Sequence, residues 1–377
     1  MGLALVPFVV LGLARFNYGL LLPAMRADLG WSYTEAGLVT TANAIGYLLG
    51  AMSSRRASQR WGLAGSLLGG LWGTAGSLLA NGLLDDYWVI ILARLAAGAF
   101  GGIAFVAGGV LATHLSSGAA RWALAVYPVG AGAAIAVSAL VLPGLAAPPS
   151  RWPVGWFSMA GLTVLVATLM TLLLRHHPLT FPSQGPTSTA GLDRLRRRVV
   201  AYGLFGLGYI GYVTFAVAYV EDAGATRTTV TALWFTLGAA SVAATWFWAR
   251  MDLGARKDWA FATALAGCSL GVLLLILEPS PWGAIASAAV FGACFLAVVS
   301  AVTQLARDTV ASATWPAAIG RLTVVFGTGQ ILGPALSGLL SDTSTGLALG
   351  LGMSAAALLT ATLAALRLGR THQVPLA

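Results

Sequence analysis

Charged residues are scarce in this chain: Asp, Glu, Lys and Arg together make up 9% of its 377 residues. A soluble domain carries about 25%, so the chain has too little charge to cover a surface that faces water. Hydrophobic residues, by contrast, make up 58% of the sequence. The composition therefore excludes a soluble globular domain and predicts an integral membrane protein.

Cysteine and histidine are also rare, at two and four residues. Cys268 and Cys294 lie inside apolar segments, where cysteine behaves as a small buried hydrophobe, and no spacing typical of a metal site or disulfide framework appears. The apolar segments contain no His-x-x-x-His or Gly-x-Ser-x-Gly pattern. We therefore expect no metal, no cofactor and no enzymatic activity.

The net charge of +9 does not indicate nucleic-acid binding, because the arginines fall in short loops between apolar segments rather than on one solvated face. If the N-terminus is cytoplasmic, most of the 21 basic residues collect on the cytoplasmic side. This bias predicts a multi-pass protein of the inner (plasma) membrane with both termini in the cytoplasm.

Twelve apolar segments are long enough to cross a bilayer, which takes about 20 residues each. The sequence therefore predicts an all-α membrane protein of twelve transmembrane helices, connected by short loops. The expected spans are 3–24, 34–54, 62–82, 87–112, 120–143, 154–174, 199–220, 229–249, 259–277, 282–305, 315–340 and 345–366.

One long polar interruption divides these spans into six and six. It predicts an N-terminal six-helix bundle at 1–175, a cytoplasmic linker loop at 176–198 and a C-terminal six-helix bundle at 199–377. A weak repeat supports two pseudo-symmetric halves: Asp28-Leu29-Gly30 follows the first span, and Asp222-Ala223-Gly224 follows the seventh.

Three arginines lie within spans: Arg15, Arg94 and Arg321. A charge at a helix centre costs at least about 2.5 to 3.5 kcal/mol in a bilayer, so Arg15 in the middle of the first span must face protein, water or an anion. Bonds to backbone carbonyls are an alternative explanation for Arg15 and for Arg94, and Arg321 lies close enough to a membrane surface for its side chain to reach it. No Asp, Glu or His lies centrally in any span. Unbalanced positive charge favours an anionic solute.

Polar and aromatic residues in other spans could line a cavity together with Arg15. For each of them, packing between helices is an alternative. The expected solute-binding set is Arg15, Asn17, Tyr18, Asn43, Tyr127, Tyr209, Tyr212 and Gln330. A rival function is a proton-coupled exporter of drugs or metabolites, although no central carboxylate is present to carry the proton.

Local motifs resemble those of the major facilitator superfamily. Arg60 and Gly62 match the signature G-x-L-a-D-R-x-G-R-R after the second helix, with Gln59 in place of its Asp. Arg94-x-x-x-Gly98 is similar to the fourth-helix signature R-x-x-q-G, and Gly329-x-x-x-Gly333-Pro334 to G-x-x-x-G-P. The resemblance implies coupling or gating roles for Arg60, Gly62, Arg94, Gly333 and Pro334.

A narrower resemblance, to the branch labelled YbfB/YjiJ-like, covers essentially the whole chain. The segments that carry it include Ala14-Arg15-Phe16 and Gly208-Tyr209-Ile210-Gly211-Tyr212. It implies a monomeric secondary active transporter that works by alternating access. The expected partners are the lipid bilayer and a small-molecule substrate, with an anion preferred, and a proton or an anion as a candidate co- or counter-transported ion.

Overall fold

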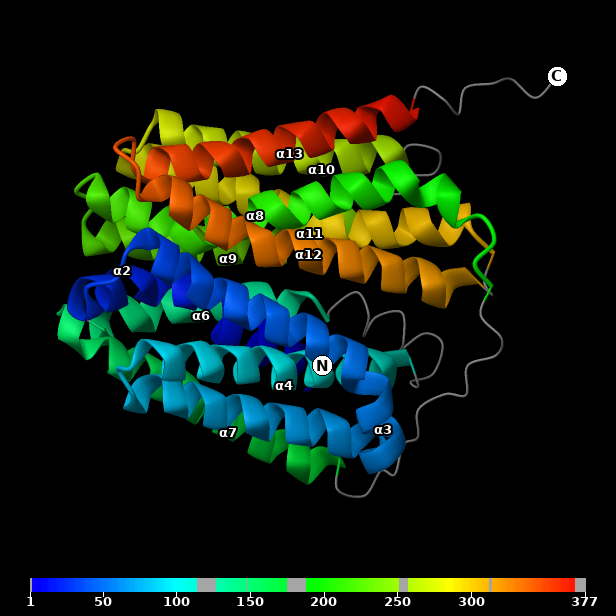
Figure 1. Ribbon diagram of the computed structural model, residues 1–377, viewed down its shortest axis with the longest axis horizontal. Helices are drawn as coiled ribbons and strands as arrows, with labels where there is room; N and C mark the ends of the chain where they lie inside the picture. The colour runs from blue at the N-terminus through cyan, green and yellow to red at the C-terminus, as the bar shows by residue number, and fades with distance from the viewer. Residues whose placement is uncertain are drawn as a thin grey trace.

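The computed structural model describes residues 2–113, 127–146, 148–174, 188–250, 257–311 and 314–369, and the regular structure in these ranges is helical (Figure 1). The first half contains α1 (Leu5–Pro7), a π-helix (Phe8–Phe16), α2 (Tyr18–Leu29), α3 (Tyr33–Leu83), α4 (Tyr87–Thr113), α6 (Val129–Leu145) and α7 (Trp152–Leu174). The second contains α8 (Arg196–Asp222), α9 (Arg227–Arg250), α10 (Lys257–Leu277), α11 (Pro281–Thr309), α12 (Trp315–Ser341) and α13 (Leu347–Gly369).

The helix lengths fit a membrane-spanning bundle. Within the described ranges, ten helical segments are long and apolar enough to cross a bilayer, and α6 is a shorter apolar helix of 17 residues. Helix α3, at 51 residues, is long enough for two crossings because one crossing needs about 20 residues. These segments together accommodate twelve membrane passes, so the predicted all-helical membrane fold is confirmed.

Helix α3 differs from the expected pair of spans joined by a loop at 55–61. Helical structure continues through these residues, and the one non-helical residue is Gly62, with φ 71° and ψ 168°. A positive φ is accessible to glycine at little cost because it has no Cβ. The expected loop is therefore wrong: a single glycine separates the two membrane passes.

The first membrane pass is irregular at its centre. Residues Phe8–Phe16 form a π-helix, which ends where the Asn17 amide donates to the carbonyl oxygen of Gly12 at 3.1 Å. The chain then continues as α2, with Pro23 inside it. A π-helical turn widens the backbone and is frequently found at functional sites. This irregular segment carries Arg15.

Two groups of helices lie side by side (Figure 1). Helices α2 to α7 form one group and α8 to α13 the other, and the groups meet where α2 packs on α8, α6 on α9 and α3 on α12. At Gly37 the backbones of α3 and α12 come into direct contact. A Cβ added at this glycine would lie 2.3 Å from the carbonyl oxygen of Pro334, which is too close for any larger residue without a shift of the helices.

The predicted division at 1–175, 176–198 and 199–377 stays a prediction. Residues 176–187 of the expected linker lie outside the described ranges, whereas a short 3-10 turn covers Leu192–Leu195 and α8 already begins at Arg196. The last part of the expected linker is therefore helical.

Candidate solute-binding cavity

A cavity of about 230 Å³ lies between the two groups of helices. Its walls come from the π-helix, α3 and α4 on one side and from α8, α11 and α12 on the other. Aromatic side chains dominate these walls, and Arg15 is the one charged residue among the described residues that line them. The aromatic set is Phe16, Tyr47, Phe105, Tyr202, Phe205, Tyr209, Phe295 and Phe326.

Arg15 is 4% exposed and lies at one end of a hydrogen-bonded chain. Its Nη2 donates to Oε1 of Gln330 at 2.8 Å, and Nε2 of Gln330 donates to the hydroxyl of Tyr209. The guanidinium lies 5.0 Å from the ring centre of Tyr47. Its Nε is buried and has no hydrogen-bond partner among the described residues. The structure thus brings together three residues of the predicted solute-binding set: Arg15, Tyr209 and Gln330.

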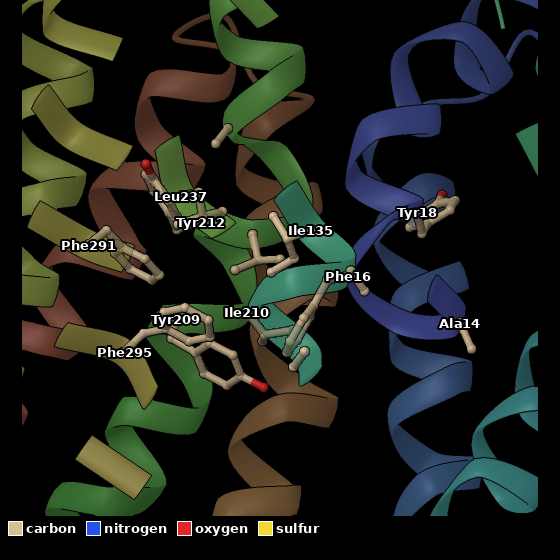
Figure 2. Packing of buried hydrophobic residues seen from close by; sticks show 14 of the residues in the cluster. Ala14, Phe16, Tyr18, Ile135, Tyr209, Ile210, Tyr212, Leu237, Phe291 and Phe295 are labelled. Atoms are coloured by element: carbon tan, nitrogen blue, oxygen red, sulfur yellow. The ribbon is translucent and has the colours of Figure 1, made fainter. Parts of the chain in front are cut away.

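Nearly parallel rings from α8 and α12 form one wall of the cavity. The rings of Tyr202 and Phe326 are 4.4 Å apart with an interplanar angle of 10°, and those of Phe205 and Tyr209 are 4.9 Å apart at 17°. Phe295 of α11 continues the wall at 15° to Tyr209 (Figure 2). Our sequence reasoning missed four of these five rings, although the spacing 202, 205, 209 marks one helix face.

Three predicted solute-binding residues lie outside the cavity lining and bond to other helices. The side-chain oxygen of Asn17 accepts from the Ser138 hydroxyl at 2.7 Å. The Tyr18 hydroxyl donates to the carbonyl oxygen of Ala36, and the amide of Asn43 donates to the carbonyl oxygen of Arg94. Each of these contacts fastens one helix of the first group to another.

Tyr127 and Tyr212 also lie outside the lining, but next to it. The Tyr127 hydroxyl donates to the carbonyl oxygen of Phe105, whose ring lines the cavity. Tyr212 shares a 2.7 Å hydrogen bond with Ser287 and stacks on Phe291 at 4.1 Å. Figure 2 shows Tyr212 and Phe291 beside Tyr209, on the side of α8 and α11.

Arg94 is fully buried and supports the π-helix rather than the cavity. Its Nη1 donates to the carbonyl oxygen of Ala14, whereas Nε and Nη2 have no hydrogen-bond partner in the part of the chain that the structure describes. The rings of Tyr18 and Trp156 lie 5.2 and 5.3 Å from the guanidinium carbon, within the range of cation–π attraction. Arg94 therefore holds the backbone of the π-helix at Ala14, the residue next to Arg15.

The remaining predicted coupling residues lie at two other places. Arg60 is exposed near the end of the first segment of α3, just before the break at Gly62. Gly333 packs α12 against α8, where an added Cβ would lie 2.3 Å from the carbonyl oxygen of Leu207. Pro334 is inside α12, and its carbonyl oxygen faces Gly37 of α3.

One end of the cavity is closed by contacts between the two groups, which we call the latch: Tyr33, Thr34, Asp222 and Asp342. The Asp342 carboxylate accepts from the backbone amides of Tyr33 at 2.7 Å and Thr34 at 2.8 Å, and Asp222 accepts from the Tyr33 hydroxyl. The cavity instead extends along α11 and α12 toward Ser300, Thr303 and Thr323, near the opposite ends of these helices.

Two groups of spanning helices around a central cavity form the architecture of major facilitator proteins. The fold is similar to that of the crystal structure of the nucleoside transporter NupG, with 15% identity, a TM-score of 0.72 and 99% coverage of both chains. It is also similar to a bacterial homolog of the human lysosomal transporter Spinster in an inward-facing, occupied conformation. That match has 14% identity, a TM-score of 0.76 and coverage of 98% of this chain and 96% of the other.

The sequence assigns the family more narrowly. Residues 7–366 match the profile of the family described as "Uncharacterised MFS-type transporter YbfB", and the chain belongs to this family. A search of curated proteins gave no match. The resemblance read from the motifs is thereby confirmed.

Proposed function

We propose that this protein is a secondary active transporter that moves a small organic anion across the inner membrane by alternating access. Membership of the family supports a location in the membrane and a small-molecule substrate. The observation that carries the choice of an anion is Arg15, a buried cation that lines the cavity and has no acidic residue beside it among the described lining. A bound carboxylate would balance this charge and accept its hydrogen bonds.

The closed latch and the elongated cavity support alternating access. If both termini are cytoplasmic, as the arginine distribution predicts, the latch lies on the outer side and the cavity extends toward the cytoplasm. The conformation is then inward-facing, like the Spinster homolog with which the chain shares its fold. Transport would require the latch to break and the opposite ends of α11 and α12 to close against the first group of helices.

The rival function is a proton-coupled exporter of drugs or metabolites. The aromatic walls would suit an apolar drug, and cation–π attraction could hold a lipophilic cation. The positive charge of Arg15 opposes a cation, and no carboxylate is present among the described residues that line the cavity. Arg94, which resembles a coupling residue of related exporters, bonds to a backbone carbonyl outside that lining.

Thermal unfolding of the purified full-length protein tests this proposal, because a ligand of the folded state stabilises it by mass action. The probes are a set of small aliphatic and aromatic carboxylates, adenosine as an uncharged aromatic solute, and tetraphenylphosphonium as a lipophilic cation. We expect only carboxylates to raise the unfolding temperature of the wild type, and no probe to raise that of Arg15→Gln. Stabilisation by adenosine or tetraphenylphosphonium alone would contradict the anion proposal.

A further inference from the structure

We infer that the solute is a planar aromatic carboxylate, held by Arg15 and the Tyr209 hydroxyl and stacked against the aromatic wall of α8 and α12. This inference rests on the proposed function and narrows it from organic anions in general to one chemical class. It follows from the direction of the hydrogen bonds in the cavity, from the orientation of the rings and from the cavity volume.

The hydrogen bonds between Arg15, Gln330 and Tyr209 can run in only one direction. An arginine side chain is a donor only, so the oxygen of the Gln330 amide must face Arg15 and its nitrogen must face Tyr209. The Tyr209 oxygen therefore accepts from Gln330. Its own proton then has no acceptor among the described residues and is available to a ligand.

Both ends of this chain thus present donors to the cavity. At one end is the guanidinium of Arg15, which lines the cavity, and at the other is the O–H of Tyr209. A carboxylate is an acceptor only and can satisfy both ends, whereas an amide or an alcohol would bring donors of its own. The chemistry of the site therefore selects a carboxylate over a neutral polar group of the same size.

The aromatic wall selects the rest of the solute. The rings of Tyr202, Phe205 and Phe326 lie within 14° of one another, and Tyr209 lies within 17° of both phenylalanines. A flat ring gains stacking energy against such a surface beyond what burial of its area provides, whereas a puckered aliphatic ring of equal size does not.

The volume of the cavity agrees with a solute of one ring. A dry cavity of about 150 Å³ holds benzene, and this cavity measures about 230 Å³. The difference leaves room for a carboxylate and a short substituent. A large multi-ring drug would exceed this space without movement of the helices.

Binding measurements with three matched probes test the inference on the purified full-length protein. Benzoate carries both features, cyclohexanecarboxylate keeps the charge without the flat ring, and benzamide keeps the ring without the charge. We expect benzoate to bind about 2- to 10-fold more tightly than cyclohexanecarboxylate, and benzamide to bind at least about tenfold more weakly than benzoate. Equal affinity for benzoate and cyclohexanecarboxylate would overturn the aromatic inference and leave the anion proposal standing. If neither carboxylate binds, the proposed function itself fails.

The variant Tyr209→Phe tests the hydroxyl, because it keeps the ring and removes the donor. We expect benzoate affinity to fall by about 10- to 100-fold, the range for a hydrogen bond to a charged group. Tyr219→Phe on the same helix is the matched control, since the Tyr219 hydroxyl donates to the carbonyl oxygen of Ile276 away from the cavity. Unchanged benzoate affinity in Tyr209→Phe, with the unfolding temperature of the unliganded protein maintained, would overturn the role of this residue.

Discussion

The carboxylate of Asp342 accepts hydrogen bonds from both the backbone amide and the hydroxyl of Thr34, at 2.8 and 2.6 Å, although 308 residues separate them. Asp342 ends α12, and Thr34 lies in the first turn of α3. A carboxylate is stabilised at a helix N-terminus by the unpaired amides and the helix dipole. Ser32 and Glu35 cap α3 from within its own turn, and Asp342 adds a second capping group from the other half of the protein. This second cap is also a contact that must break when this end opens.

We therefore predict that Asp342→Asn favours the conformation that is open at the latch. Thr40 reports this opening, because it is 2% exposed and lies deeper along α3, beside Thr214 of α8. In a Thr40→Cys background, Asp342→Asn should increase the rate of maleimide labelling several-fold. Glu35→Gln is the matched control, since Glu35 caps α3 only within its own turn. An equal increase in both variants would show that fraying of α3, and not the contact between halves, controls labelling.

The latch should also be insensitive to pH near neutrality. Burial alone would raise the pKa of Asp342, but hydrogen bonds from the Thr34 hydroxyl and from the backbone amides of Thr34 and Tyr33 outweigh it and lower that pKa below its ordinary value. A depressed pKa means that the contribution to the closed state is complete above the ordinary aspartate pKa and is lost only as pH falls through the depressed one. The labelling rate of Thr40→Cys, divided at each pH by that of a fully exposed cysteine to correct for the loss of thiolate, should therefore stay constant between about pH 8 and pH 5. A steep rise within that range would identify a different titrating group in the latch.

Arg94 should matter for stability more than an exposed arginine does. Arg94→Leu leaves the Ala14 carbonyl without its donor, which costs about 1 to 3 kcal/mol for a buried group, and it removes two cation–π contacts. Loss of an unbalanced buried charge offsets part of this cost. We expect a net loss of about 1 to 3 kcal/mol, seen as a lower unfolding temperature in detergent. Arg56→Leu, an exposed change on α3, should leave that temperature unchanged. A more stable Arg94→Leu protein would mean that the cost of the buried charge dominates.

The packing of α3 on α4 depends on glycines at particular positions. A Cβ at Gly98 would lie 2.1 Å from the carbonyl oxygen of Asn43, whereas a Cβ at Gly109 on the same helix would meet no atom within 4 Å. Gly98→Ala should therefore destabilise the protein by about 1 to 3 kcal/mol. Gly109→Ala should stabilise it by up to about 1 kcal/mol through helix propensity. Similar unfolding temperatures for the two variants would show that α3 and α4 can separate without cost.

The helices could be predicted from the sequence because apolar length alone determines a membrane span. The fourth span was expected at 87–112 and is observed as Tyr87–Thr113. The connection at 55–61 could not be predicted in the same way. Its arginines indicate that the chain leaves the membrane, but a helix can continue outside the bilayer until a residue interrupts it. In α3 the helix is interrupted only at Gly62, which has a positive φ.

The cavity could be predicted only in part. Arg15 was identifiable because a charge at the centre of a membrane helix is costly and must face protein, water or an anion. Uncharged polar residues carry a smaller cost, so their positions did not show which of them face the cavity. A helix that is apolar on all sides does not reveal which face points to a cavity, and Tyr18 and Asn43 prove to bond to other helices. The π-helix at Phe8–Phe16 has no sequence signal that we recognise. Phe326 joins the aromatic wall by tertiary packing alone.

The single charge in the cavity has an electrical consequence. With Arg15 the one charged residue among the described lining, an empty site carries one positive charge, and a site that holds a monovalent anion is neutral. Moving one elementary charge through 100 mV takes about 2.3 kcal/mol. Membrane voltage would then act on the return of the empty carrier and leave the loaded step unaffected. Each cycle still moves one negative charge with the solute, so a voltage that is negative inside favours export of the anion and opposes its uptake.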